Sequence, residues 1–281
     1  MSHWRDDLPP NTPSLARLAG KVAVVTGAGS SGPGLGNGRA SAILMARQGA
    51  IVALLDLSST AAAETLEVIL SEGGEATVLE CDVSSPASCD QAISKLTRDF
   101  GRADVLINNV GILGPRGTAV DVVPEDWDRA MATNVTSMVL MAKGCIPLMR
   151  RSGRGSIVNV ASIAGIQGGH PDLFYPTSKG AIIQLTRAMA AQHGAEGIRV
   201  NCVAPGMIYT PMVSGGMDAA AREHRRLQSL LKTEGNAWDV ALAALFLASD
   251  DSRWITGIVL PVDGGVLAGP TAGVTGYATS S

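Results

Sequence analysis

Three side chains in the middle of the chain have the types and the spacing needed to move a proton at an alcohol or a carbonyl. Tyr175 and Lys179 are four residues apart, which places them next to each other on one face of a helix. A phenol with a pKa of about 10 is a poor proton shuttle at neutral pH, but a nearby cation favours the phenolate. Ser162 ends the strand-like run Ile157–Ala161, where its hydroxyl can hold a substrate oxygen. Together the three residues predict carbonyl chemistry.

A glycine-rich segment near the N-terminus has the pattern of a loop that holds a pyrophosphate. It runs from Gly27 to Gly38, after the apolar run Val22–Thr26 and before a helical pattern at Arg39–Gln48. Glycine also serves ordinary tight turns, but here the following helix N-terminus can stabilise a phosphate charge. Asp56 ends the next apolar run, 18 residues after Gly38, where an acid hydrogen-bonds the adenosine ribose. The segment therefore predicts a dinucleotide site.

The residue at the end of the second apolar run also bears on the choice of cofactor. A carboxylate at the position of Asp56 repels a 2′-phosphate, which favours NAD(H) over NADP(H). Between Gly27 and Asp56 the cationic residues are Arg39 and Arg47, and both fall in the helical pattern. We therefore expect NAD(H) as the cofactor, with faster turnover on NADH than on NADPH.

Strand-like and helix-like patterns alternate along the chain. Short β-rich runs occur at Val22–Thr26, Ile51–Leu55, Ala76–Glu80, Val105–Ile107, Ser156–Ala161, Arg199–Val203 and Ile258–Val262. Helical patterns occur at Arg39–Gln48, Ala61–Ser71, Pro86–Phe100 and Glu125–Met149, with Pro124 as a start signal for the last. The strand runs are apolar without strict alternation, which indicates strands covered on both faces. We expect an α/β fold, a single Rossmann-type doubly wound domain with about seven parallel strands and helices on both faces.

Length and charge exclude several classes of protein. The chain has 281 residues, of which 46% are apolar and 17% charged, enough for a large core. A net charge of −3 without a block of like charges argues against nucleic acid as a partner. The start of the chain lacks the pattern of a signal peptide, and uncharged windows are broken by Gly and Pro, which argues against a membrane partner. We expect a cytoplasmic protein with the domain at 21–267, an N-terminal arm at 1–20 and a tail at 268–281.

The cysteines do not form a metal-binding pattern. Cys81, Cys89, Cys145 and Cys202 include no Cys-x-x-Cys pair and no His at metal spacing. We expect reduced core residues and no metal site, with a Cys81–Cys89 disulfide as the alternative.

In these residues the chain resembles the short-chain dehydrogenase/reductase family, from about Lys21 to Leu267. Besides Ser162, Tyr175 and Lys179, the resemblance is carried by Thr26-Gly27, Cys81-Asp82-Val83, Asn108-Asn109-Val110-Gly111, Asn134, Pro205-Gly206-Met207-Ile208-Tyr209-Thr210 and Val262-Asp263-Gly264-Gly265. It implies an NAD(P)-dependent enzyme acting on CH–OH groups and a homotetramer. The phosphate loop departs from the family's spacing, since eight residues separate Gly27 from Gly36, about five more than usual. Val110 stands where alanine is usual, a small change that we expect to be tolerated.

The resemblance implies a catalytic role for four residues. Tyr175 would be the general acid/base, and Lys179 would bind the nicotinamide ribose and lower the pKa of Tyr175. Ser162 would orient the substrate oxygen. Asn134 would hold a water that relays the proton, although a simple buried amide is the alternative.

The resemblance also implies cofactor contacts along the whole site. Asp82 and Val83 would cradle adenine, whereas Ile208 and Thr210 would contact the nicotinamide amide. The complete set of expected cofactor residues is Gly27, Gly36, Asn37, Gly38, Asp56, Leu57, Asp82, Val83, Asn108, Asn109, Gly111, Tyr175, Lys179, Pro205, Gly206, Ile208 and Thr210.

Three features leave alternatives open. His170 precedes Tyr175 in a Gly-rich turn and either faces the substrate or is solvated, and we expect the latter. The basic cluster Arg222, His224, Arg225 and Arg226 could hold a carboxylate, but a solvated helix face is expected. The segment Met207–Asn236, rich in Met and Gly, is expected to form a lid over a modest apolar substrate.

These patterns predict an NAD(H)-dependent oxidoreductase that interconverts a secondary alcohol and a ketone, with a small-molecule substrate. One alternative is an NADP(H)-dependent ketoreductase similar to 3-oxoacyl reductases, against which Asp56 argues. The other is a non-catalytic NAD-binding regulator, which has no need of a proton shuttle such as Tyr175.

Overall fold

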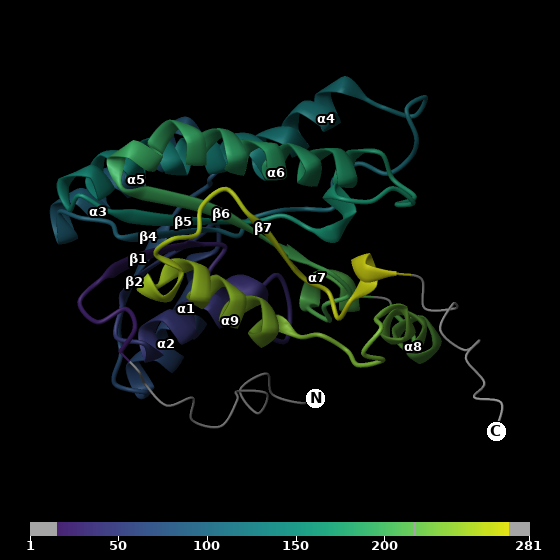
Figure 1. Ribbon diagram of the computed structural model, residues 1–281, viewed down its shortest axis with the longest axis horizontal. Coiled ribbons are helices and arrows are strands. Elements are labelled where there is room, and N and C mark those ends of the chain that lie inside the picture. The colour runs from purple at the N-terminus through teal and green to yellow at the C-terminus, as the bar shows by residue number, and fades with distance from the viewer. Residues whose placement is uncertain (1–15, 216, 270–281) are drawn as a thin grey trace.

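The computed structural model describes residues 16–215 and 217–269, which contain one seven-stranded parallel sheet (Figure 1). The strands are β1 (Val22–Thr26), β2 (Ile51–Asp56), β3 (Glu75–Glu80), β4 (Val105–Asn108), β5 (Gly155–Val160), β6 (Ile198–Pro205) and β7 (Val259–Val262). Their order is β3-β2-β1-β4-β5-β6-β7, with every pairing parallel. This confirms the predicted Rossmann-type fold. The strand order reverses between β1 and β4, and such sheets bind ligands beyond the carboxyl ends of the strands at that point.

Helices cover both faces of the sheet (Figure 1). One layer contains α1 (Asn37–Arg47), α2 (Ser59–Ser71) and α9 (Ala237–Ala248), and the other contains α3 (Pro86–Phe100), α5 (Ser137–Arg151) and α6 (Phe174–His193). Three shorter helices are α4 (Pro124–Met131), α7 (Pro211–Ser214) and α8 (Ala219–Gln228). Of these, α7 and α8 follow the carboxyl end of β6, so that they lie beside the ligand-binding edge.

The core lies on both sides of the sheet, which explains why the strand runs lack alternation. In β1, Ala23 and Val25 pack against the layer of α1 and α9, whereas Val22 and Val24 pack against the layer of α3 and α5. All four are at most 3% exposed. A strand buried on both faces needs apolar residues at every position.

Two boundaries differ from the sequence prediction. Leu18 is fully buried and its N–H donates to the carbonyl of Gln48, so the core begins inside the predicted arm at 1–20. The rest of that arm, residues 1–15, and residues 270–281 of the tail lie outside the described residues. The helix predicted over Glu125–Met149 is α4 and α5 joined by a π-helical turn at Ala132–Thr136.

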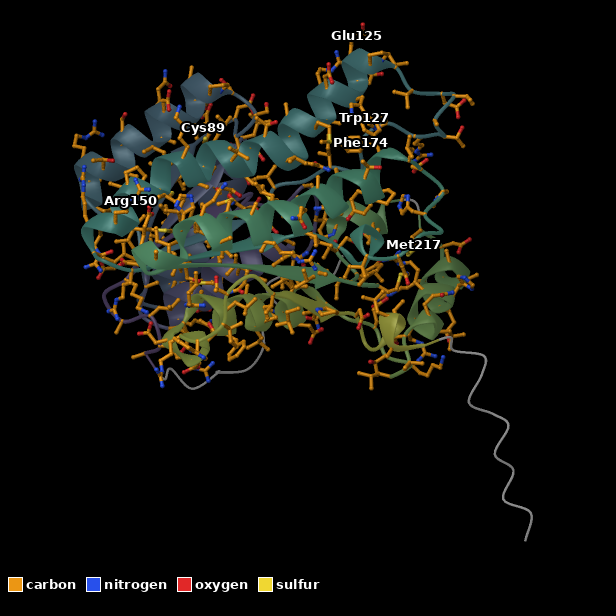
Figure 2. All side chains as sticks on the ribbon, turned by 45° about the horizontal axis from the view of Figure 1, so that its top comes forward. Cys89, Glu125, Trp127, Arg150, Phe174 and Met217 are labelled. Carbon is orange, nitrogen blue, oxygen red and sulfur yellow. The ribbon has the colours of Figure 1, made fainter. Side chains whose placement is uncertain are left out.

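An aromatic contact fixes the start of α6. The ring of Trp127 in α4 meets the ring of Phe174 edge-on, with centroids 5.4 Å apart (Figure 2). Phe174 is 1% exposed, and a Cβ at Gly114 would overlap its ring. Because Tyr175 follows Phe174 directly, this packing positions the predicted catalytic tyrosine.

The cysteines are buried free thiols, as expected, and Cys81 and Cys89 are not joined by a disulfide. Cys89 donates to the carbonyl of Val83 at 3.4 Å. Within the described parts of the chain, no helix has the length and apolar character to cross a membrane.

Candidate active site

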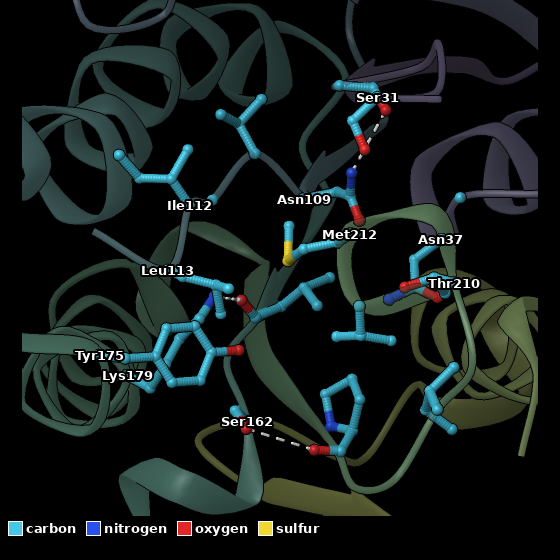
Figure 3. A pocket seen from close by; sticks show the side chains of 18 of the residues that line it. Ser31, Asn37, Asn109, Ile112, Leu113, Ser162, Tyr175, Lys179, Thr210 and Met212 are labelled. Carbon is cyan, nitrogen blue, oxygen red and sulfur yellow. Dashed lines mark hydrogen bonds between the residues drawn. The ribbon is translucent and has the colours of Figure 1, made fainter. Parts of the chain in front are cut away.

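A cavity of about 1150 Å³ runs along the carboxyl ends of the strands. Its walls come from the segments after the first six strands, from α6 and from parts of α7 and α8. Figure 3 shows Ser162, Tyr175 and Lys179 close together in this cavity. The fold thus brings the predicted proton-transfer residues and the predicted dinucleotide loop into one site.

The glycine-rich loop packs tightly against the start of α1. Gly27 has a φ of 64°, a conformation that favours glycine, and a Cβ at Gly38 would overlap the carbonyl oxygen of Gly27. Gly36 is the N-cap of α1, and no side-chain hydrogen bond caps the helix. The buried Oδ1 of Asn37 has no hydrogen-bond partner in the described chain. These unsatisfied groups at a helix N-terminus fit a pyrophosphate and the sugars beside it.

The carboxylate of Asp56 is held in place at the end of β2. Its Oδ2 accepts from the N–H of Gly29 at 2.8 Å, and its Oδ1 accepts from the N–H of Ser58 at 2.9 Å. Each oxygen keeps a lone pair for a further donor such as a ribose hydroxyl. Asp82 and Val83 follow the neighbouring strand β3 and line the same cavity.

The two arginines between Gly27 and Asp56 are held elsewhere. Arg39 is 1% exposed and donates to the carbonyl of Ala61 at 3.0 Å and to Glu64 at 2.8 Å. Arg47 makes two hydrogen bonds of 2.7 Å to the carboxylate of Glu72. Neither arginine lines the cavity.

The segment after β4 contributes differently from what the sequence implied. Asn109 lines the cavity and donates from Nδ2 to the carbonyls of Thr26 and Gly27 at 3.2 and 3.3 Å. Asn108 is buried within the sheet and donates to Oδ1 of Asn159 at 2.9 Å. The other sixteen expected cofactor residues line the cavity, whereas Asn108 lies outside its lining.

Lys179 is buried in the lining of the cavity and fixed by a backbone carbonyl. Its Nζ donates to the carbonyl of Val160 at 3.1 Å and lies 5.6 Å from the centre of the Tyr175 ring. A Cβ at Gly111 would stand 3.1 Å from this Nζ, so the absence of a side chain there leaves room for the ammonium. Burial lowers the pKa of Lys179 to about 8.

Ser162 and Tyr175 both line the catalytic end of the cavity. Ser162 accepts from the N–H of Ala164 at 3.2 Å and donates to the carbonyl of Pro205 at 3.4 Å. Burial raises the pKa of Tyr175, while the hydrogen bond with Ser162 and the charge of Arg225 act in the opposite direction. Arg225 is thus a second cation near Tyr175, besides Lys179, whose Nζ lies 5.6 Å from the ring centre.

Asn134 lies in the π-helical turn and is fully buried. Its Oδ1 accepts from the N–H of Ile112 at 2.8 Å, and its Nδ2 donates to the carbonyl of Ile112 and to Ser178 at 2.9 and 3.0 Å. Ser178, which the sequence analysis missed, donates in turn to the carbonyl of Tyr175 at 2.9 Å. The Asn134 side chain therefore joins the segment after β4 to α6, and both of its amide hydrogens are used.

His170 does not lie on a solvated loop, contrary to expectation. It is half-buried, lines the cavity, and stacks at a tilt against the ring of Tyr175, with centroids 5.3 Å apart. Its position beside a catalytic tyrosine depends on the path of the turn after Ser162, which sequence spacing does not define.

The basic cluster on α8 is only partly a solvated helix face. His224 is exposed, and Arg222 and Arg226 pair with Glu234 and Glu223 respectively. Arg225 instead lines the cavity and is half-buried. The expectation of a solvated face is therefore wrong for Arg225. Gln228, one turn further along α8, also lines the cavity and was missed by the sequence analysis.

The segment predicted as a lid forms one wall of the cavity. Met207, Met212 and Val213 line it, and α7 and α8 stand beside it. The N–H of Tyr209 donates to the carbonyl of Gly235, which ties the two ends of this segment together.

Known proteins share this fold. The family model described as enoyl-(acyl carrier protein) reductase matches residues 34–267. Levodione reductase of Leifsonia aquatica is 33% identical over 258 residues, covering 89% of this chain and 95% of the relative. The chain belongs to the short-chain dehydrogenase/reductase family. It is thus an oxidoreductase that acts on alcohol and ketone groups and binds a nicotinamide cofactor.

Solved structures of this family show the same fold with either cofactor. A 7α-hydroxysteroid dehydrogenase complexed with NADH and 7-oxo glycochenodeoxycholic acid has a TM-score of 0.83 and 33% identity, covering 92% of this chain and 98% of its own. A gluconate 5-dehydrogenase of Burkholderia cenocepacia J2315, in complex with NADP and tartrate, has a TM-score of 0.83 and 30% identity, covering 91% of this chain and 98% of its own. Membership of the family therefore leaves the choice between NAD and NADP to the residues of each chain.

Proposed function

We propose that this dehydrogenase uses NAD(H) and interconverts a secondary alcohol and a ketone, with Tyr175 as the general acid/base. The observation that carries the cofactor choice is the carboxylate of Asp56, fixed by two backbone N–H groups at the end of β2. A fixed carboxylate accepts hydrogen bonds from ribose hydroxyls and repels a 2′-phosphate.

The surroundings of Asp56 support the same choice. In the described chain, the Lys and Arg residues that line the cavity are Lys179 and Arg225, and both belong to its catalytic end. Arg39 and Arg47 are paired with carboxylates on α2 or just after it. No cation of the described lining therefore stands beside Asp56 to balance a 2′-phosphate.

When bound, the nicotinamide ring supplies or accepts the hydride. The residues of the chain then handle the substrate oxygen. In reduction, Tyr175 donates a proton to the oxygen as negative charge develops on it, and Ser162 holds the same oxygen by a hydrogen bond. The raised pKa of Tyr175 keeps the phenol protonated at neutral pH, which suits this donor role.

Lys179 and Asn134 are the two other residues that we assign to the catalytic group. The carbonyl of Val160 holds the ammonium of Lys179 near the Tyr175 ring. From this position the ammonium would donate hydrogen bonds to the nicotinamide ribose. The amide of Asn134 positions Ile112 and Ser178. Because both amide hydrogens are used there, a proton-relay water at this residue would bind as a donor to one of its oxygens.

The segment Met207–Asn236 would act as the lid that excludes water during hydride transfer. Its methionines Met207 and Met212 offer adaptable apolar surface on the cavity wall.

We also propose a cytoplasmic homotetramer. The 94% exposed Trp254 supports a subunit contact near β7, and light scattering should give four times the chain mass of 28.8 kDa.

Two measurements on the purified protein test the proposal. Fluorescence titration should give a lower Kd for NADH than for NADPH. Absorbance at 340 nm should report turnover on a panel of secondary alcohols, diols and ketones. Tighter binding and faster turnover with NADPH would favour the ketoreductase alternative, and tight NADH binding without turnover would favour a regulator.

A further inference from the structure

Two of the three arginines on α8 are neutralised by carboxylates of the chain. Nε of Arg222 lies 2.8 and 3.1 Å from the two carboxylate oxygens of Glu234, and its guanidinium stacks 3.8 Å from the centre of the Tyr209 ring. Arg226 makes two hydrogen bonds to Glu223, at 2.7 and 2.6 Å. Both pairs lie on the exposed side of the helix, where they stabilise the fold only weakly.

Arg225 differs from both neighbours. It lines the cavity, is half-buried, and donates to the carbonyl of Ile208 at 3.4 Å, a long hydrogen bond. Among the described residues no carboxylate lies within ion-pair distance of it. Burial lowers its pKa, while the charges of Glu234 and Tyr175 act in the opposite direction. The guanidinium is thus partly desolvated in the wall of the cavity that Tyr175 also lines, without a carboxylate within ion-pair distance.

The charges of the cavity are divided between its two ends. The acids in the described lining are Asp56 and Asp82, which follow β2 and β3 at the adenosine end. The Lys and Arg residues of that lining are Lys179 and Arg225, which follow β5 and β6 at the catalytic end. A small anion therefore meets only attractive formal charges beside Tyr175.

Two further polar side chains line the same end. Nδ1 of His170 lies 3.1 Å from both the N–H and the carbonyl oxygen of Asp172, which fixes the ring at the cavity wall. Gln228 lies one turn after Arg225 and lines the cavity with it, and its Nε2 is within hydrogen-bond distance of Nε2 of His224 at 3.0 Å. Polar side chains thus accompany the cation in the cavity wall, as in sites that fix the orientation of a polar ligand.

We propose that Arg225 binds a carboxylate of the substrate, so that the alcohol is a hydroxy acid and the ketone is the corresponding oxo acid. This inference rests on the proposed function for the reaction itself. Arginine suits the task because its planar guanidinium binds a carboxylate through two parallel hydrogen bonds. Leu113 and Met212, also in the cavity lining, provide apolar surface for the hydrocarbon part of such an acid. The sequence pattern predicted a modest apolar substrate because it did not reveal a cation in this wall.

The test compares oxo acids with their neutral esters. Initial rates with NADH are measured on 2-oxobutanoate and 3-oxobutanoate, each against its methyl ester. The wild type should prefer at least one acid over its ester by about 10- to 100-fold in kcat/KM, as expected for a hydrogen-bonded ion pair. In the Arg225→Gln variant this preference should fall to about one, with Arg225→Lys in between. The Arg226→Gln variant removes the same charge from the same helix and should keep the preference.

Equilibrium binding separates the inference from the proposed function. The oxo acids and esters are titrated calorimetrically into the NADH complex of Tyr175→Phe, with and without Arg225→Gln. Acid binding that depends on Arg225 without turnover in the wild type would overturn the proposed function but support the inference. Turnover or binding with no preference for the acids would overturn the inference. An equal loss of acid and ester turnover in Arg225→Gln, with a shifted pH profile, would also overturn it, because Arg225 would then act only on Tyr175.

Discussion

Replacing Tyr175 by Phe should remove turnover while leaving the fold and the cofactor site in place. The substitution deletes the hydroxyl that moves the proton, and general acid/base catalysis contributes about 100- to 10,000-fold. We therefore expect kcat/KM with NADH to fall by roughly 100-fold or more. Loss of the phenol hydroxyl should lower the free energy of unfolding by only about 1 kcal/mol, because Ser162 keeps its hydrogen bonds to Ala164 and Pro205.

The assay measures kcat/KM at 340 nm, the Kd for NADH by fluorescence, and the unfolding free energy in urea. Tyr209→Phe is the matched control. Tyr209 lies outside the cavity lining and stacks on Arg222, so the loss of its hydroxyl should change turnover by less than about twofold. The reasoning would be refuted by a less than tenfold loss of kcat/KM in Tyr175→Phe, or by an equal loss of NADH binding.

Three further predictions follow from the loop, the acid and the buried lysine. Gly38→Ala should weaken NADH binding and lower the unfolding free energy by about 2 kcal/mol, because its Cβ overlaps the carbonyl of Gly27; Gly194→Ala, with open space around it, is the control for urea unfolding. Asp56→Asn should lower the NADH-to-NADPH ratio of kcat/KM by about tenfold, since it removes the repulsion of a 2′-phosphate; an unchanged ratio would contradict this role. The pKa of Lys179 is about 8 in the folded chain against an ordinary value of 10.5, so the unfolded chain binds this proton more tightly. Stability should therefore rise between these two pH values by up to roughly 3 kcal/mol relative to Lys179→Met, and urea unfolding of both proteins at pH 7 and pH 10 should show the difference.

The strands and the dinucleotide loop were predictable because their causes are local. Val22–Thr26 is apolar at every position because both faces of β1 are buried, and this is visible in the sequence itself. The glycines at 27 and 38 follow from the close approach of backbone to a phosphate, and the acid at 56 follows from its hydrogen bond to the ribose. The i,i+4 spacing of Tyr175 and Lys179 likewise needs only one helix.

The environment of each functional side chain was less predictable, because it depends on contacts between distant segments. The cavity-lining position of Arg225 is set by the path of the chain between β6 and α9, although Arg222, Arg225 and Arg226 look alike in the sequence. The side-chain amide of Asn134, in the π-helical turn, is hydrogen-bonded to Ile112, which lies 22 residues away in the sequence. Burial raises the pKa of Tyr175. The sequence shows the nearby lysine, but it does not show how deeply the tyrosine is buried.

The central claim is that hydride from NADH, rather than from NADPH, reaches the carbonyl carbon of the substrate in this site. An equimolar mixture of NADH carrying two deuterium atoms at C4 and unlabelled NADPH, given to the wild type with the best ketone or oxo acid, tests this directly. Mass spectrometry of the alcohol should show deuterium on the carbinol carbon in most of the product. An alcohol without deuterium at that carbon would show that NADPH is the donor and would contradict the role of Asp56.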